Sequence, residues 1–209
     1  MQDLFRVEGL FYRVMSRIWQ LLLLNLLMLV TSLPVVTIGA AQAAGFTVTM
    51  RMIRGEDTHL VTAYLDSFKQ NFKQSTLLWS GLSILSIILM INWRYLTVMN
   101  QLSSGVALGV LIVTVLVIYL LQCSFFYIAR FQDTLFHALQ NVLKVAVSYP
   151  IRSLGVLIVT TVPVVIVALS PYLIVFSLYL SFFVGIGFVH FLRTYLLLAL
   201  FKKVEQEKQ

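Results

Sequence analysis

The sequence predicts an all-α integral membrane protein, a helical bundle with six membrane-spanning helices. Of its 209 residues, 60% are apolar and 11% are charged, whereas an ordinary soluble domain carries about 25% charged residues. Four runs contain no charged residue and are 20 to 40 residues long: 18–50, 74–93, 95–129 and 153–192. A spanning helix needs about 20 apolar residues. This composition argues against a water-soluble globule and a disordered chain, and the length suits a single domain.

Prolines divide the longest runs. Pro34 lacks a backbone donor and disfavours helix in the residue before it, so residues 18–50 are predicted to form a helical hairpin with Thr37 as an N-cap. Ser170-Pro171 divides the last run. Kinks are expected at Pro163 and around Gly185 and Gly187. The six predicted spans cover residues 18–33, 37–52, 75–92, 106–127, 151–169 and 172–200.

The distribution of basic residues predicts the orientation, because cytoplasmic flanks of spans are enriched in Lys and Arg. With both termini in the cytoplasm, 14 of the 15 basic residues lie on the cytoplasmic side, and only Arg94 lies outside. A single span across residues 18–50 would leave 11 of them on that side. We therefore expect a multi-pass protein of the cell membrane. Its net charge of +7 suits contact with the anionic lipid of the bilayer and is not a sign of nucleic-acid binding.

Two segments between the spans are predicted to form amphipathic helices, residues 58–74 and 131–147. Apolar residues recur at helical spacing in both, opposite charged and amide side chains. Such helices can rest on lipid headgroups or on the protein's own bundle. Alternatively, they can serve as a docking surface for a cytoplasmic partner.

Three motifs occur in order: SLPVVTIGAA at residues 32–41, RGE at 54–56 and FKQNFKQST at 68–76. With them, the sequence resembles the YesL-like family of bacterial membrane proteins over about residues 15–80. The family has no established activity, and its genes often lie beside genes for the uptake and breakdown of complex carbohydrates, including binding-protein-dependent importers. The resemblance therefore implies an accessory role in that uptake. The matching motif positions are Pro34, Thr37, Gly39, Arg54, Asn71 and Lys73.

Small residues are concentrated on the second predicted span: Gly39, Ala40, Ala41, Ala43, Ala44 and Gly45. At four-residue spacing, small residues let helices approach closely in lipid. The expected use is packing within the hairpin. The alternative is a face that binds another protein, either a permease subunit or a second copy of this chain.

Groups that carry chemistry are sparse. All eight carboxylates lie outside the predicted spans, the three histidines show no ligand spacing, and Cys123 is alone. We therefore predict no enzymatic activity, no metal and no cofactor. Inside the spans, a few polar residues are expected to form interhelical hydrogen bonds or to line a polar path: Asn25, Gln42, Gln122, His190 and Arg193. His190 and Arg193 share a helix face, where an anionic lipid headgroup or a carboxylate of a partner could bind.

These observations favour a non-catalytic accessory membrane protein that partners a binding-protein-dependent sugar importer. One alternative is a small-solute transporter or channel in its own right, as an oligomer. The absence of intramembrane carboxylates counts against an ion-coupled type. The other alternative is a membrane sensor or regulator of carbohydrate use.

Overall fold

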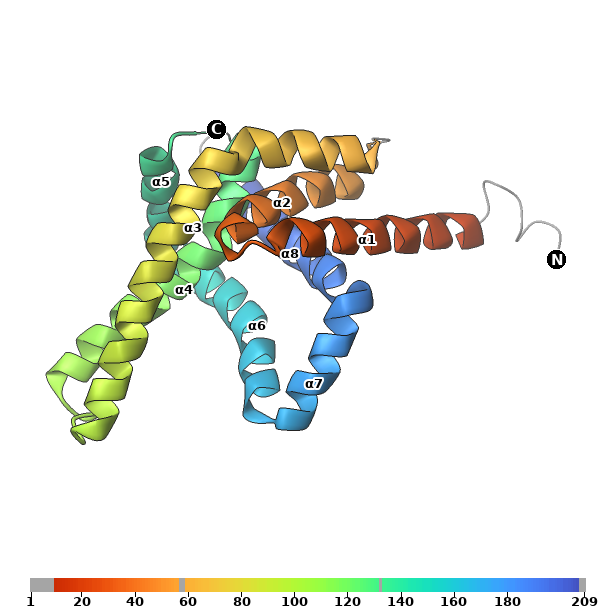
Figure 1. Cartoon of the computed structure of the whole chain (residues 1–209). Helices are drawn as coiled ribbons and strands as arrows, with labels where there is room; N and C mark the ends of the chain where they lie inside the picture. Colours follow the sequence, from red (N-terminus) through yellow and green to blue (C-terminus); the bar gives the residue numbers. More distant parts are fainter. Residues whose placement is uncertain (1–9, 57–58, 132, 207–209) are drawn as a thin grey trace.

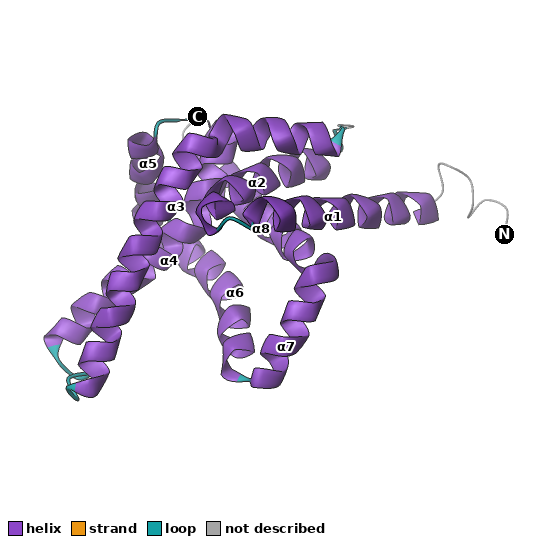
Figure 2. Cartoon of the chain, viewed as in Figure 1, coloured by secondary structure: helices purple, strands orange, loops and turns teal. Residues whose placement is uncertain are grey.

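The computed structural model describes residues 10–56, 59–131 and 133–206, and regular structure in this part of the chain is entirely helical (Figure 2). The predicted all-α class is confirmed. Short turns connect the elements: α1 (Leu10–Ser32), the 3₁₀ turn η2 (Val35–Thr37), α2 (Ile38–Arg54), α3 (Leu60–Val98), α4 (Gly105–Phe131), α5 (Leu135–Ser148), α6 (Pro150–Leu169), α7 (Pro171–Leu180), the π-helical turn η3 (Ser181–Gly185) and α8 (Ile186–Gln206).

Four helices are long and apolar enough to cross a membrane: α1, α3, α4 and α6. The α7–α8 pair is bent by 87° and makes a fifth if it is counted as one span. These helices support a multi-pass membrane protein. α2 has 17 residues, about 25 Å at 1.5 Å per residue, which is short of the roughly 30 Å hydrocarbon core.

Pro34 interrupts the helical backbone between α1 and α2, as predicted. Its backbone is extended, with φ −74° and ψ 114°. Thr37 is the N-cap residue of α2, as predicted, but its side chain makes no capping hydrogen bond to that helix. Its hydroxyl instead donates to the carbonyl oxygens of Thr31 at 2.5 Å and of Pro34 at 2.7 Å. These bonds close the turn onto the end of α1, which fixes the angle between the two helices.

Gly55 ends α2. Its φ of +72° lies in the left-handed region, which costs glycine least because it has no Cβ. The N–H of Gly55 donates to the carbonyl of Met52 at 3.2 Å, and the N–H of Glu56 donates to that of Arg51 at 3.1 Å. This is the common helix stop in which terminal carbonyls are satisfied by the residues just beyond the helix. Arg54 and Glu56 form an exposed ion pair of 3.7 Å across it.

α3 corrects one prediction. The expected amphipathic helix 58–74 and the expected span 75–92 form one continuous helix of 39 residues; Thr58 lies outside the described residues. No proline or glycine occurs between Leu60 and Ser80, so nothing interrupts the backbone bonds. The helix bends instead of breaking. Its first, amber part runs beside α2, and the remainder turns away beside α4 (Figure 1).

The predicted amphipathic segment 131–147 corresponds to α5, which begins only at Leu135; Phe131 ends α4, and Gln132 lies outside the described residues. The buried residues of α5 are Ala138, Val142 and Val145, and they belong to the core cluster that also contains residues of α4. Between the two alternatives of bundle and lipid, this face therefore packs on the protein's own bundle. Pro150 stands at the start of α6, where a missing N–H is tolerated, and it separates α6 from α5.

The segment expected to form a single span, 172–200, is not one continuous helix. α7 and α8 are separate helices joined by the π-helical turn Ser181–Gly185, so the kink expected around Gly185 is a sharp bend. Single π-helical turns often interrupt longer helices. Pro163 lies inside α6, which continues through it.

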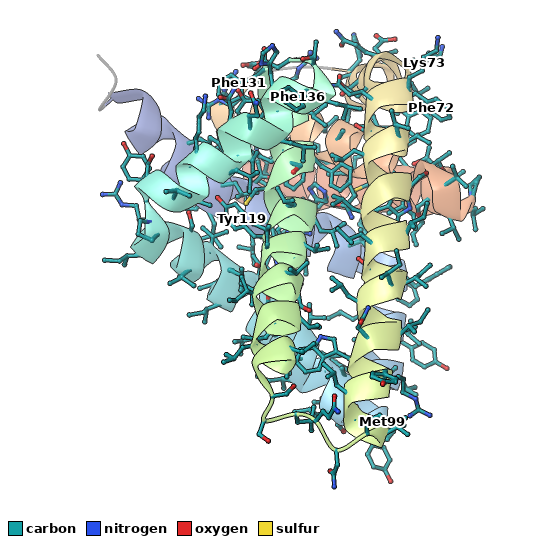
Figure 3. All side chains as sticks on the ribbon, turned by 90° about the vertical axis from the view of Figure 1, so that its left-hand side faces the viewer. Phe72, Lys73, Met99, Tyr119, Phe131 and Phe136 are labelled. Carbon is teal, nitrogen blue, oxygen red and sulfur yellow. The ribbon has the colours of Figure 1, made fainter. Side chains whose placement is uncertain are left out.

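α2 lies at the centre of the bundle and contacts α1, α3, α4 and α8. From this centre two hairpins, α3–α4 and α6–α7, extend toward the same side of the molecule (Figure 1). Figure 3 shows α3 and α4 side by side, with Lys73 and Phe131 at one end and Met99 at the other. α6 and α7 are largely exposed: the buried residues of α6 are Ser153 and Val156, and α7 has none.

Close packing of α2 on α3 gives the first prediction. A Cβ at Gly39 would meet the carbonyl oxygen of Ser75 at 2.3 Å and Cβ of Trp79 at 2.7 Å. We expect Gly39→Ala to destabilise the protein by about 1–3 kcal/mol, the usual cost of overpacking, measured by thermal unfolding in mild detergent. Gly109→Ala is the control, because nothing lies within 4 Å of its Cβ position. Equal unfolding temperatures for the two variants would contradict the packing.

Candidate functional site

The small residues of α2 face the chain's own helices. Ala40, Ala41, Ala43 and Ala44 are at most 2% exposed. Gly39 lies against α3, and a Cβ at Gly45 would lie 2.9 Å from Sδ of Met28. Other helices of this chain therefore occupy the face that the sequence offered either to internal packing or to a partner.

The candidate site is a polar seam along one face of α8, formed by Gly187, His190 and Thr194. Their three- and four-residue spacing keeps them on one side of the helix. All three are buried, and each makes a polar contact with α1 or α2. Three of the predicted intramembrane polar residues, Asn25, Gln42 and His190, are brought together in this seam.

The side chain of Asn25, on α1, binds backbone groups at the turn between α7 and α8. It is 1% exposed. Its side-chain nitrogen donates to the carbonyl oxygens of Ser181 at 3.2 Å and Phe182 at 2.9 Å, and its side-chain oxygen accepts from the N–H of Gly187 at 3.0 Å. A π-helical turn leaves backbone groups without their usual partners, and one amide side chain provides both the donor and the acceptor that they need.

Gln42 and Thr49 of α2 continue the seam. Oε1 of Gln42 lies 3.0 Å from Nε2 of His190, and the hydroxyls of Thr49 and Thr194 share a hydrogen bond of 2.6 Å. Both residues of the second pair are fully buried. α2 and α8 are therefore joined by two polar contacts inside the bundle.

Arg193 lies beside the seam, on the side of Phe46. Its guanidinium carbon lies 5.8 Å from the centre of the Phe46 ring, and the His190 ring lies 4.1 Å from the same centre. Nε of Arg193 and Nδ1 of His190 are buried and have no hydrogen-bond partner among the described residues. His190 itself is 2% exposed. These are the two buried nitrogens at this site whose hydrogen-bonding capacity is unused.

Gln122 is separate from the seam. It lies on α4, donates to Thr161 of α6 at 2.9 Å, and accepts a hydrogen bond from Thr160. Tyr119 and Ser153 share a second hydrogen bond between the same helices, of 3.3 Å. These bonds attach α6 to α4 and line no common site with Asn25, Gln42 or His190.

The remaining motif residues have structural positions. Asn71 is buried on α3 and donates to the carbonyl of Ser67 at 3.0 Å. Ser67 in turn donates to Thr47 of α2 at 2.8 Å. Lys73 is exposed at the end of the straight part of α3 (Figure 3).

Sequence reasoning missed the hydroxyl residues of these contacts: Thr47, Thr49, Thr160, Thr161 and Thr194. Threonine is common in membrane helices because its hydroxyl can bond the carbonyl one turn back, so a single threonine is a weak signal. The four-residue spacing of His190 and Thr194 was the available indication. A network at the α4–α5 corner was also missed. There Tyr127 donates to Asp133 at 2.8 Å and accepts from Asn141 at 2.8 Å, and Gln74 donates to the Asp133 carbonyl.

No group of three His, Cys, Asp or Glu side chains in the described ranges could hold a metal ion. What the seam offers chemically is hydrogen bonding and one positive charge.

The fold and the seam together define a class: an all-helical, multi-pass membrane protein whose interior is joined by polar contacts. Within it, residues 21–93 match the model of a family described as "Protein of unknown function, DUF624". The match covers about half of α1, all of α2 and most of α3, and includes Asn25 and Gln42 but not His190 or Arg193. No curated protein and no solved structure matches the chain.

The contacts of Asn25 give the second prediction. Asn25→Leu removes the partners of two carbonyls and one N–H in the α7–α8 break. Each buried polar group left without a partner costs about 1–3 kcal/mol, so we expect a clear loss of stability. Amide exchange in residues 181–187 should rise more than in α3 or α4.

The matched control is Asn92→Leu, because Asn92 is exposed and bonds only the Ile88 carbonyl in its own helix. We expect it to change stability by less than about 0.5 kcal/mol. If Asn25→Leu left the exchange of residues 181–187 unchanged, the proposed role of Asn25 would be wrong.

Proposed function

We propose that this chain is a non-catalytic accessory protein of the cell membrane that partners the permease subunits of a binding-protein-dependent carbohydrate importer. The carbohydrate association comes from the resemblance of residues 15–80 to the YesL-like family. The geometry of the structure favours an accessory protein over a transporter.

The observation behind this preference is that amide side chains inside the bundle are hydrogen-bonded within the chain. Asn25, Gln42 and Gln122 are all engaged with other groups of the chain. A transporter places such groups around a water-accessible site near the middle of the membrane. By contrast, the groove between α4 and α6, of about 270 Å³, and the groove between α3 and α4, of about 240 Å³, are lined by apolar side chains and a few hydroxyl groups, with no charged or amide side chain. This favours an action through surfaces over an action through a path.

The α6–α7 hairpin is the surface best suited to a partner within the membrane. Its two helices expose nearly all of their apolar side chains. The helical structure is interrupted at each end of the hairpin, at Tyr149–Pro150 and at Ser181–Gly185. In the membrane, helices associate through close packing, for which a projecting hairpin offers two free faces.

The third prediction tests this partner. A tagged chain is purified in mild detergent from its native cells grown on a complex glycan, and co-purifying proteins are identified. We expect stoichiometric recovery of permease subunits. Ile158→Trp on α6 should reduce that recovery several-fold because the bulky side chain prevents close packing.

The control is Ile87→Trp on α3, since Ile87 and Ile158 are both 55% exposed. Equal loss in both variants would indicate a general defect and not a specific surface. Recovery of the wild-type chain alone, as a discrete oligomer, would contradict the accessory role and favour transport, with flux in liposomes as the next assay.

The proposal includes a topology with both termini in the cytoplasm. Six crossings would put the turn at residues 33–37 on the outer side. One contact supports a different path: Gly39 packs against Ser75 and Trp79. From Ser75, α3 continues for about 35 Å to Val98 at 1.5 Å per residue, enough to cross the membrane. In this arrangement, the turn lies at the cytoplasmic end of that crossing.

We therefore favour four crossings, made by α3, α4, α6 and the bent α7–α8 pair, with α1 and α2 as a re-entrant pair. The segment 33–37 contains no charged residue, so this path satisfies the distribution of basic residues as well as six crossings do. The short length of α2 also suits a helix that does not cross.

The fourth prediction distinguishes the two topologies. In a Cys123→Ala background, Val35→Cys and Ser103→Cys are treated in intact cells with a membrane-impermeant thiol reagent. Val35 is 67% exposed in the protein, so only the membrane or the cell interior would protect it. We expect labelling of the cysteine at 103 and not of the one at 35. Labelling of both would support six crossings.

A further inference from the structure

We propose that Arg193 and His190 form a binding site for a phosphate group at the edge of the polar seam. The inference rests on an arginine inside the bundle that has no counter-charge. It is independent of the proposed accessory function.

Arg193 has no acidic partner. Its guanidinium forms no ion pair or hydrogen bond within the described part of the chain. It makes a cation–π contact with Phe46, whose ring centre lies 5.8 Å from the guanidinium carbon. The sequence contains no Asp or Glu between Glu8 and Glu56, between Asp66 and Asp133, or between Asp133 and Glu205. α1, α2 and residues 186–204 of α8 therefore supply no carboxylate to the seam. An arginine remains charged in proteins, and a charge removed from water is stable only when paired.

A second unused group lies beside it. His190 precedes Arg193 by three residues, and both side chains contact Phe46. The His190 ring is 98% buried, yet its Nδ1 has no partner. The amide of Gln42 can present either its oxygen or its nitrogen to Nε2, because the two are nearly indistinguishable by shape. With the nitrogen facing Nε2, Nδ1 carries the hydrogen and donates to a bound anion.

The ligand that fits these groups is a phosphate oxygen pair. The planar guanidinium presents paired N–H donors that match phosphate geometry, and the Phe46 ring supports its other face. Arg193 is partly exposed while His190 is buried, so the site opens on the Arg193 side. A membrane supplies phosphodiesters from its lipids, and the adjoining solution supplies free phosphate.

The fifth prediction uses full-length protein in a maltoside detergent, which contains no phosphate. Thermal unfolding is followed while phosphatidylglycerol, inorganic phosphate or diacylglycerol is added. Diacylglycerol carries the same acyl chains as the phospholipid without the phosphate. We expect phosphatidylglycerol to raise the unfolding temperature of the wild type and diacylglycerol to leave it unchanged. If inorganic phosphate raises the unfolding temperature and phosphatidylglycerol does not, the ligand is a soluble phosphate. If phosphatidylglycerol raises it and inorganic phosphate does not, the ligand is the lipid.

Arg193→Gln should abolish the rise, while Arg94→Gln, which removes an exposed charge on α3, should retain it. His190→Gln keeps a partner for Gln42 and removes Nδ1, so the apparent affinity should fall several-fold. If Arg193→Gln cannot be purified, Arg193→Lys decides: the charge remains but the paired donors are lost, and the affinity should fall about tenfold.

Two results would overturn the proposal. One is a rise in the Arg193 variant equal to that of the wild type. The other is no difference between phosphatidylglycerol, phosphate and diacylglycerol in the wild type.

Discussion

Contact between α2 and its neighbours is the constraint on which the rest of the structure depends. Gly39 lets the backbone of α3 approach to a distance that a single methyl group would prevent, and alanines on the remaining faces are fully covered. Small side chains bury little apolar area each, so the free energy comes from many close contacts along the helix. This explains why a helix too short to cross a membrane alone is nevertheless the most enclosed element of the fold.

From that centre, polar contacts determine where the outer helices attach. Asn25 binds the break before α8, Thr49 binds Thr194, and Gln122 binds the threonines of α6. Apolar packing has little directional preference, whereas a hydrogen bond in a medium without water fixes one partner and one register. The same chain therefore has a rigid interior and two hairpins that are attached chiefly at their bases.

Much of this could be predicted from the sequence where the signal is local. The break at Pro34, the stop at Gly55 and the division at Pro171 each follow from the backbone chemistry of one residue. The continuity of α3 could not be predicted in this way, because a change from amphipathic to wholly apolar character looks like a boundary although the backbone continues. The sharp bend between α7 and α8 depends on Asn25, which is more than 150 residues away in the chain. The candidate site follows the same rule: its polar residues could be named from the sequence, but their grouping could not. Asn25, Gln42 and His190 meet through tertiary packing, while Gln122, equally polar, lies elsewhere.

The distribution of satisfied and unsatisfied groups is informative about function. A polar side chain that merely stabilises a bundle has its capacity filled, as for Asn25, which uses both ends of its amide. Arg193 and Nδ1 of His190 differ because their capacity remains free in a region without a carboxylate. In a low-dielectric setting, an unpaired charge is too unfavourable to be retained as packing alone. The seam therefore combines two roles along one face of α8: a saturated part that holds the bundle together, and an unsaturated end that is suited to an anion from outside the chain.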